Sequence, residues 1–171
     1  MFIRPETPED IDEIDAVVEA AFGRPAEAKL VRLLRASDVF VPELSLVAVE
    51  DGAVVGHVMI THATLTSEAG KERRILLLAP LAVRPDRQRD GIGGALVNAG
   101  LAAADARGEP LVVLLGHPQY YPRFGFEPAG QRSILPPEPD VPRDEFMVKR
   151  LSAYDSSYTG RVAYPPAFDE I

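Results

Sequence analysis

The chain has 171 residues, of which 46% are hydrophobic and 26% charged, and it contains no cysteine. Such a chain is typical of one globular domain, which excludes wholesale disorder, a disulfide scaffold, a thiolate metal site and a cysteine nucleophile. Lys and Arg number 18 and Asp and Glu 26, so the net charge is −8. That excess of negative charge argues against nucleic acid or an anionic membrane as a partner.

No basic stretch followed by an apolar one opens the sequence, so a signal peptide is not expected. The longest apolar run, Ile75 to Val83, has nine residues and contains Pro80. A membrane-spanning helix needs about 20 apolar residues. Together with the lack of cysteine, these features predict a cytoplasmic protein without a membrane span.

The N-terminal segment predicts a strand and two helices. Phe2 to Arg4 is a short strand, and Thr7-Pro8-Glu9-Asp10 resembles a helix start with a capping box. Apolar residues at helical spacing follow as far as Gly23, which ends the helix. A second helix begins at Pro25, and its buried face is predicted to carry Leu30, Leu33 and Leu34.

Three antiparallel strands are expected next, at 46–49, 54–65 and 73–83. Asp51-Gly52, between the first two, is a strong signal for a two-residue hairpin. Pro80 lies in the third strand and cannot donate a hydrogen bond to a neighbour. It therefore predicts a bulge or a point where pairing stops.

The remaining elements predict a parallel crossover and an irregular end. A helix over 91–107 leads to the apolar run 111–115, which is typical of a strand buried on both faces. Nine of the 16 prolines lie at or beyond Pro118, and a last strand is expected at 145–151. We predict one domain over 1–151 and a tail over 152–171 packed on it.

Residues 81–96 are the most informative stretch for function. A buried strand ends, a polar loop with Arg84, Arg87 and Arg89 follows, and glycines open a helix. A helix start of this kind offers unpaired N–H groups to an anion, and glycine lets a phosphate approach the backbone. The alternative is that the glycines only make a tight turn. The loop lacks the lysine of a P-loop, and Leu96 stands where a dinucleotide fingerprint has Gly or Ala.

Two motifs resemble the GNAT superfamily of N-acetyltransferases. Gln88-Arg89-Asp90-Gly91-Ile92-Gly93, after a strand that ends Leu81-Ala82-Val83, is similar to the acetyl-CoA signature Gln/Arg-x-x-Gly-x-Gly/Ala. Tyr121-Pro122-Arg123-Phe124-Gly125-Phe126 resembles the Tyr-x-x-x-Gly-Phe segment that follows the fifth strand of the family. The order of elements over about residues 1 to 150 is also similar.

The resemblance implies an α/β fold with a mixed sheet of about seven strands flanked by helices, in which two parallel strands splay apart. The pantetheine arm of acetyl-CoA would insert between them as an added strand. Asp90 departs from what a phosphate loop favours unless its side chain points to solvent. The residues implied in cofactor binding are Leu81, Ala82, Val83, Gln88, Arg89, Asp90, Gly91, Ile92, Gly93 and Gly94.

The reaction implied is direct attack of an amine on the thioester, with Tyr121 as the general acid for the leaving thiolate. The alternative for Tyr121 is a ring that only packs over the strand end. His62 is a candidate base; His117, Glu27 and Glu43 also remain open. His57 and His62, five residues apart on one strand, face opposite sides and make no ready metal pair, so no metal is expected.

The predicted function is therefore acetyl-CoA-dependent N-acetyl transfer to a small-molecule or protein amine, and a non-catalytic acyl-CoA-binding sensor on the same fold is the alternative. The net charge of −8 favours a cationic acceptor through electrostatic steering. The sequence leaves the oligomeric state open, a homodimer included.

Overall fold

The computed structural model describes all residues 1–171, which form two compact units. The first unit comprises Met1–Thr61, Leu78–Ala103 and Pro166–Ile171, and the second comprises His62–Leu77 and Ala104–Pro165. Strands β3 (Ala53–Thr66) and β4 (Glu72–Val83) contribute residues to both units. Each unit is described in turn.

The strands follow the order β1-β2-β3-β4-β5-β8-β6, and β9 pairs with β3 and with β7. The pairing is mixed: β2 is antiparallel to β3, while β4 and β5 are parallel, with Leu76 opposite Val112. This confirms the α/β class and the parallel crossover. The seven strands of the main path agree with the number expected, and β7 and β9 are additional. The other strands are β1 (Phe2–Pro5), β2 (Ser45–Glu50), β5 (Leu111–Leu115), β6 (Glu127–Pro128), β7 (Ile134–Leu135), β8 (Phe146–Arg150) and β9 (Gly160–Ala163).

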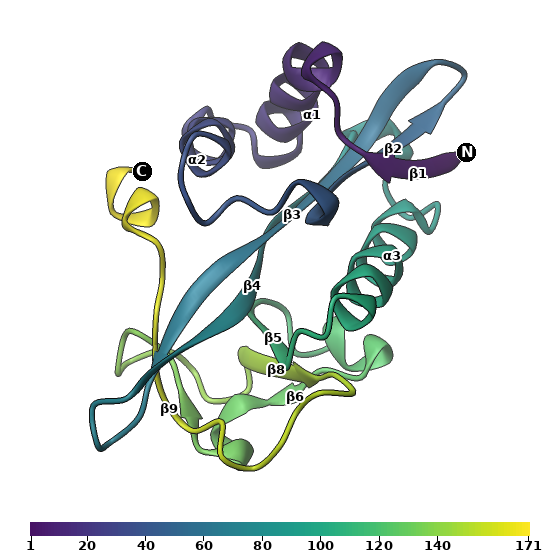
Figure 1. The fold of residues 1–171 in the computed structure, drawn as a ribbon. Helices are drawn as coiled ribbons and strands as arrows, with labels where there is room; N and C mark the ends of the chain where they lie inside the picture. The colour runs from purple at the N-terminus through teal and green to yellow at the C-terminus, as the bar shows by residue number, and fades with distance from the viewer. The chain divides into compact units, whose positions relative to one another are not determined.

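In the first unit, α1 (Ile11–Phe22) and α2 (Ala26–Arg35) cover one face of β2 and β3 (Figure 1). Their apolar residues form one core with strand residues such as Val47 and Met59. Gly23 ends α1 with φ 69°, as the sequence predicts, because glycine takes this left-handed conformation without strain. The leucines of α2 lie in or against the same core, which confirms their expected structural role.

Helix α3 (Ile92–Ala106) packs on the other face of β3 (Figure 1). The contact is close because two glycines lie at the crossing. A β carbon on Gly56 would lie 2.9 Å from Leu96 Cδ1, and one on Gly100 would lie 2.8 Å from Ile60 Cδ1. The start of α3 is thereby held against the sheet.

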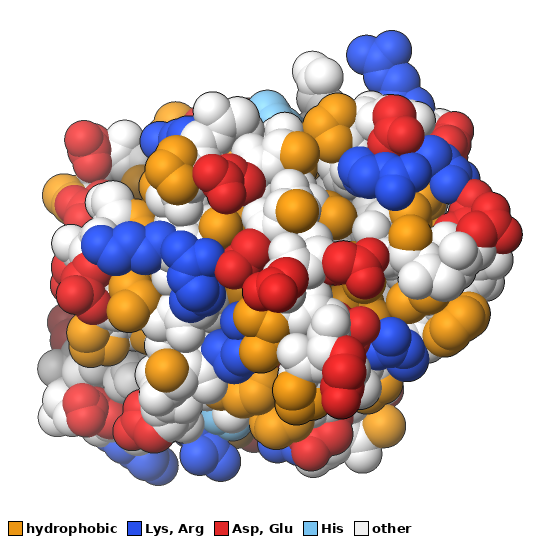
Figure 2. Space-filling model, turned by 90° about the horizontal axis from the view of Figure 1, so that it is seen from above, with side chains coloured by type: hydrophobic (Ala, Val, Ile, Leu, Met, Phe, Trp, Pro, Cys, Tyr) orange, Lys and Arg blue, Asp and Glu red, His pale blue; other side chains and the backbone are white.

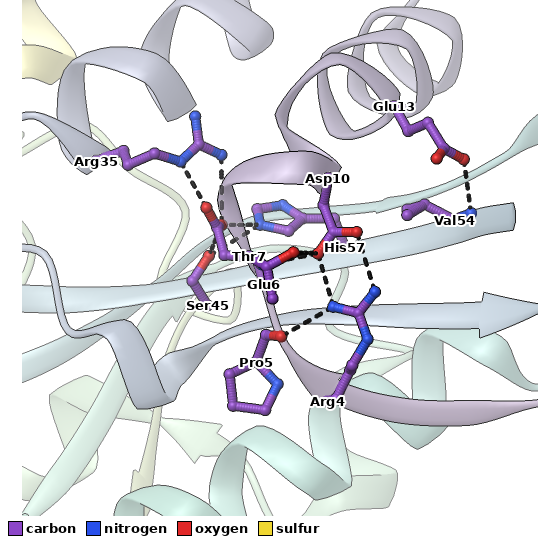
Figure 3. A network of polar contacts seen from close by, with 10 residues as sticks. All are labelled: Arg4, Pro5, Glu6, Thr7, Asp10, Glu13, Arg35, Ser45, Val54 and His57. Atoms are coloured by element: carbon purple, nitrogen blue, oxygen red, sulfur yellow. Dashed lines mark hydrogen bonds and ion pairs between the residues drawn. The ribbon is translucent and has the colours of Figure 1, made fainter. Parts of the chain in front are cut away.

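A buried polar network in the first unit joins Glu6, which directly follows β1, to residues of β2, β3 and α2 (Figure 3). Glu6 accepts hydrogen bonds from Arg35 Nε at 2.6 Å and from the hydroxyl of Ser45. The Nε2 atom of His57 lies 3.2 Å from Glu6 Oε1 and 3.0 Å from Ser45 Oγ. Since His57 is fully buried among these partners, it forms part of the packing that joins the strands to α2.

A second polar cluster fixes the start of the first helical segment, just before α1. Asp10 Oδ2 accepts the backbone N–H of Thr7 at 2.7 Å, which confirms the expected capping box. Arg4 donates two hydrogen bonds to the same carboxylate, at 2.6 and 3.0 Å (Figure 3). These contacts tie β1 to the turn Pro8–Asp10.

Most charged side chains of the first unit are paired. Arg32 lies 2.7 Å from Asp15, and Arg4 and Arg35 pair with Asp10 and Glu6. Figure 2 accordingly shows basic and acidic side chains interspersed on the face it views, with no extended basic patch there.

In the second unit, β8 lies between β5 and β6 and is antiparallel to both. Residues 152–171 contribute β9, which pairs with the end of β3, and then the turn Pro166–Glu170, which belongs to the first unit. The two-residue strands β6 and β7 were not predicted, because two residues are too few to show an alternating pattern. No helix in the structure has the length and apolarity needed to cross a membrane.

Candidate active site

The strand that precedes the glycine-rich loop presents one partly uncovered face. In β4, Pro80 and Ala82 are buried, whereas Leu81 and Val83 are half-buried. Ala82 packs into the core with α1 and α2. The Ala79–Pro80 peptide is cis, and β4 continues through it to Val83. Directly after β4, Arg84 donates its backbone N–H to Val55 O in β3 at 2.8 Å, so the chain is still bonded to β3 where the loop begins.

The loop between β4 and α3 is held by ion pairs. Arg87 bonds both carboxylate oxygens of Glu50 and lies 3.1 Å from Asp90 Oδ2. Arg84 pairs with Asp86 at 2.7 Å. Asp90 shares Arg87 with Glu50, so a single guanidinium faces two carboxylates and does not cancel the charge of Asp90. The Asp90 side chain is 52% exposed, and it therefore extends toward solvent, the orientation in which an acid is acceptable in a phosphate loop.

The start of α3 offers hydrogen-bond donors. Arg89 and Gly91 both have positive φ, 69° and 82°, and turn the chain into the helix. The N–H of Ala95 bonds Gly91 O at 3.0 Å, so the amides of Ile92, Gly93 and Gly94 precede the first helical hydrogen bond. Arg89 is exposed and makes no ion pair. Unpaired amides, the positive end of the helix dipole and a free guanidinium form an arrangement that fits a phosphate group.

Gln88 braces the loop against the strand. Its side-chain Nε2 donates to Val83 O at 3.1 Å. One of the carbonyl groups expected to contact a pantetheine arm is therefore already engaged by a residue of the signature itself.

In the second unit, Tyr121 lies just beyond the end of β5. Gly116 donates its N–H to Glu145 O at 2.9 Å, and His117 O accepts the N–H groups of Tyr120 and Tyr121 at 3.1 and 3.4 Å. The Tyr121 ring makes edge contacts with Tyr120 and Phe126, at centroid distances of 5.0 and 5.8 Å. Burial is the larger cause and the nearby Tyr120 the smaller one, and together they raise the pKa of the Tyr121 phenol to about 12. The phenol is thus protonated at neutral pH and available as a hydrogen-bond donor.

Sequence reasoning missed that Gly116 lies directly against the Tyr121 ring. A β carbon at this position would lie 2.5 Å from Tyr121 Cε2, which is too close for any side chain. A glycine directly after the buried run Leu111–Leu115 was the available signal. The need for glycine at position 116 becomes clear only in the fold, where the ring of Tyr121, five residues later, packs against it.

The candidate bases lie in different surroundings. His62, at 8% exposure, has a Nδ1 atom without a hydrogen-bond partner. Burial lowers its pKa and the charge of Arg74 lowers it further, so His62 is neutral at pH 7 and able to accept a proton. Glu109 also affects the pKa of His62, so the two residues lie near each other. Glu109 lies just before β5, whereas Tyr121 lies beyond the other end of that strand. His117 is exposed.

The two candidate carboxylates belong to the first unit. Glu27, in the first turn of α2, is buried and bonded by the Arg24 guanidinium, with Nε at 2.9 Å. Glu43 lies in the short turn Pro42–Leu44 before β2.

Comparisons with known proteins agree with these features. The family model for the acetyltransferase (GNAT) domain matches residues 2–129. Two uncharacterised N-acetyltransferases of Escherichia coli are each 38% identical: YjhQ over 90% of this chain and 86% of its own, and YhbS over 99% of both.

Solved structures are also similar. The complex of Escherichia coli YhbS with CoA matches with a TM-score of 0.87 and 35% identity, over 98% of this chain and 91% of that one. A GNAT acetyltransferase of Brucella melitensis in complex with acetyl-CoA matches with a TM-score of 0.80 and 36% identity, over 98% and 97%. On the family match, the relatives and the shared fold, the chain is an acyltransferase that belongs to the GNAT family of N-acetyltransferases.

Proposed function

We propose that this enzyme transfers the acetyl group of acetyl-CoA to a primary amine. The observation that carries the proposal is the start of α3, which offers free first-turn amides and the unpaired Arg89. The acid of the preceding loop, Asp90, is exposed and pairs with Arg87. These groups fit the pyrophosphate of CoA. The CoA and acetyl-CoA complexes of the two similar structures support the same ligand.

The cofactor residues proposed are Leu81, Ala82 and Val83 on the strand and 88–94 on the loop and helix start. The strand backbone would pair with the pantetheine arm, in the manner of an added strand. The amides of Gly93 and Gly94 would bind phosphate oxygens, and the exposed Arg89 would add charge. Arg87, occupied by Glu50 and Asp90, would hold the loop in shape.

The chemistry proposed is a direct transfer. The neutral amine nitrogen attacks the thioester carbonyl carbon, a tetrahedral oxyanion forms, and the carbon–sulfur bond breaks to release the thiolate. Tyr121 donates its phenolic proton, or a hydrogen bond, to the departing sulfur, and the amine loses a proton to the base. With a pKa of about 12, Tyr121 is a weaker acid than a free thiol of pKa about 8.5. Hydrogen-bond donation that stabilises the thiolate is therefore its main contribution.

His62 is the base that we propose to test. Its lowered pKa keeps it unprotonated at neutral pH, and its Nδ1 atom is unpartnered. A water relay would be needed, because the imidazole is buried.

The function is tested by measuring CoA release from acetyl-CoA with a panel of amines. Thermal unfolding with and without acetyl-CoA tests binding alone, since a ligand at 100 times its dissociation constant stabilises by about 2.7 kcal/mol. Stabilisation together with amine-dependent CoA release supports the transferase. Stabilisation without release from any amine would indicate the acyl-CoA-binding sensor instead.

A further inference from the structure

The loop that carries the cofactor signature is bonded to a strand that is distant in the sequence. Glu50 is the last residue of β2 and lies 37 positions before Arg87, and both residues belong to the first unit. The two Nη atoms of Arg87 donate to the two carboxylate oxygens of Glu50, Nη2 at 3.0 Å. Because the guanidinium is planar, such a paired contact fixes orientation as well as distance.

The remaining donor of Arg87 reaches the other end of the same turn. Its Nε donates to Asp90 Oδ2 at 3.1 Å. Between these two residues lies Arg89, whose φ of 69° is a left-handed conformation that residues other than glycine seldom adopt. Arg87 thus joins the residues on both sides of a strained position, and Glu50 fixes Arg87 to the sheet. The first-turn amides of α3 follow directly after this turn.

Glu50 itself lies on a well-anchored hairpin. It pairs with Ala53 across the two-residue turn Asp51-Gly52. The backbone N–H of Val54 donates to Glu13 Oε2 of α1 at 2.9 Å, which ties the hairpin to that helix. A carboxylate on a rigid element holds its partner at a lower entropic cost than one on a mobile loop.

Charge alone does not account for a glutamate at this position. An acid near a phosphate site repels the ligand, and an ion pair close to the surface adds little to the stability of a fold. The hydrogen bond from Arg87 lowers the pKa of Glu50, so the carboxylate is ionised and the pair is complete at neutral pH. What the pair supplies is therefore the geometry of the loop.

We propose that Glu50 is a positioning residue for acetyl-CoA binding, which holds Arg87 and, through Arg87 and Asp90, the turn that presents the phosphate-binding amides. The proposal rests on the proposed function. It predicts the sign of an effect: loss of the Glu50 carboxylate weakens cofactor binding, although it removes a negative charge from the neighbourhood of an anionic ligand.

Binding is tested with Glu50→Gln, which keeps the length of the side chain but loses its charge. We expect the dissociation constant for acetyl-CoA, measured by calorimetry, to rise by about 3- to 10-fold, the usual effect of having to order a side chain on binding. Asp51→Asn is the matched control, because it removes an exposed carboxylate one residue away, where asparagine accepts the φ of 52°. The control should bind at least as tightly as the parent. Parental or tighter binding by Glu50→Gln would overturn the proposal.

A second acetyl donor separates positioning of the phosphate loop from general damage. S-acetylpantetheine carries the same thioester and pantetheine arm as acetyl-CoA but lacks the pyrophosphate. Glu50→Gln should raise KM for acetyl-CoA by about 3- to 10-fold with kcat kept, and should leave kcat/KM for S-acetylpantetheine unchanged. An equal loss with both donors would contradict the proposal, because a merely structural role affects both.

The route through Arg87 is tested by a double-mutant cycle. If Glu50 acts through this guanidinium, adding Glu50→Gln to Arg87→Gln should cost no further affinity for acetyl-CoA, since the pair is already broken. Fully additive losses would mean that Glu50 acts in another way and would overturn the proposal. Failure of the proposed function is a different result, in which the parent itself is not stabilised by acetyl-CoA and releases no CoA with any amine.

Discussion

The ring of Tyr121 occupies the space that a side chain on Gly116 would need, with Cε2 and Cδ2 only 2.5 and 2.9 Å from the β carbon position. The glycine that directly follows β5 therefore leaves the space in which the Tyr121 ring packs.

Gly116→Ala should displace the Tyr121 ring and lower kcat, with little change in acetyl-CoA affinity, because the glycine lies outside the phosphate loop. The test is a double-mutant cycle with Tyr121→Phe. If Gly116 acts through the phenol, adding Gly116→Ala to Tyr121→Phe should cost little further turnover. Fully additive losses would mean that the alanine damages something other than the position of this ring.

Tyr121→Phe keeps the ring and its packing but removes the proton donor. We expect kcat to fall by about 10- to 100-fold, at the lower end of what general acids supply, because a phenol of pKa about 12 donates a hydrogen bond more readily than its proton. Steady-state kinetics and acetyl-CoA titration of the two variants Tyr121→Phe and Tyr120→Phe provide the measurement. Equal turnover in both, with binding intact, would remove the acid role from Tyr121.

Gly93→Val places a branched side chain at the helix start proposed to bind pyrophosphate. Acetyl-CoA affinity should fall by at least tenfold while the fold is kept, since one or more charge-assisted hydrogen bonds are lost. Ala102→Val adds the same side chain at an exposed position of α3 and serves as the control for helix stability. Calorimetric titration with acetyl-CoA decides the point: parental affinity in Gly93→Val would contradict the phosphate site.

His62 should make activity depend on pH. A base works only when deprotonated, and burial lowers the pKa of His62 below its ordinary 6.5. The log of kcat/KM should therefore rise with pH and level off below about pH 6.5. His62→Ala should abolish this limb and His117→Ala should leave it in place. A profile that His62→Ala does not alter would assign the proton to another group or to a water chain.

Glu6 should govern stability in acid. Burial raises the pKa of this carboxyl, but hydrogen bonds from His57, Arg35 and Ser45 outweigh that effect and lower the pKa from 4.5 to about 2. A depressed pKa stabilises the fold above about pH 4.5, and this contribution of roughly 3 kcal/mol is lost as the pH falls toward 2. Glu6→Gln should thus be less stable than the parent at pH 7 in urea unfolding. The difference between the two should shrink at pH 3; a constant difference would contradict the assigned pKa.

Local sequence patterns determined much of this protein. The helix start at Thr7, the hairpin at Asp51-Gly52 and the strand Leu111–Leu115 lie where the sequence predicts them. The strand is buried as expected except at Leu115, which is exposed. Each depends on capping, turn chemistry or periodicity within a few residues, which the chain carries in any context. The motifs at 88–93 and 121–126 likewise pointed to the family, because the residues that define each motif are close together in the sequence.

Tertiary structure decided the remainder. The ion pair of Asp90 depends on Arg87, which also pairs with Glu50 from another strand. The environment of His57 depends on Glu6, Ser45 and Arg35 from three separate segments. A cavity of the second unit that is lined by Leu135, Phe146 and Arg161 likewise joins residues of three strands, β7, β8 and β9. Contacts between distant segments leave no periodic pattern in the chain, because they form only when packing brings those segments together. Burial and charge at such places, and hence pKa values and ligand preference, follow from the assembled fold.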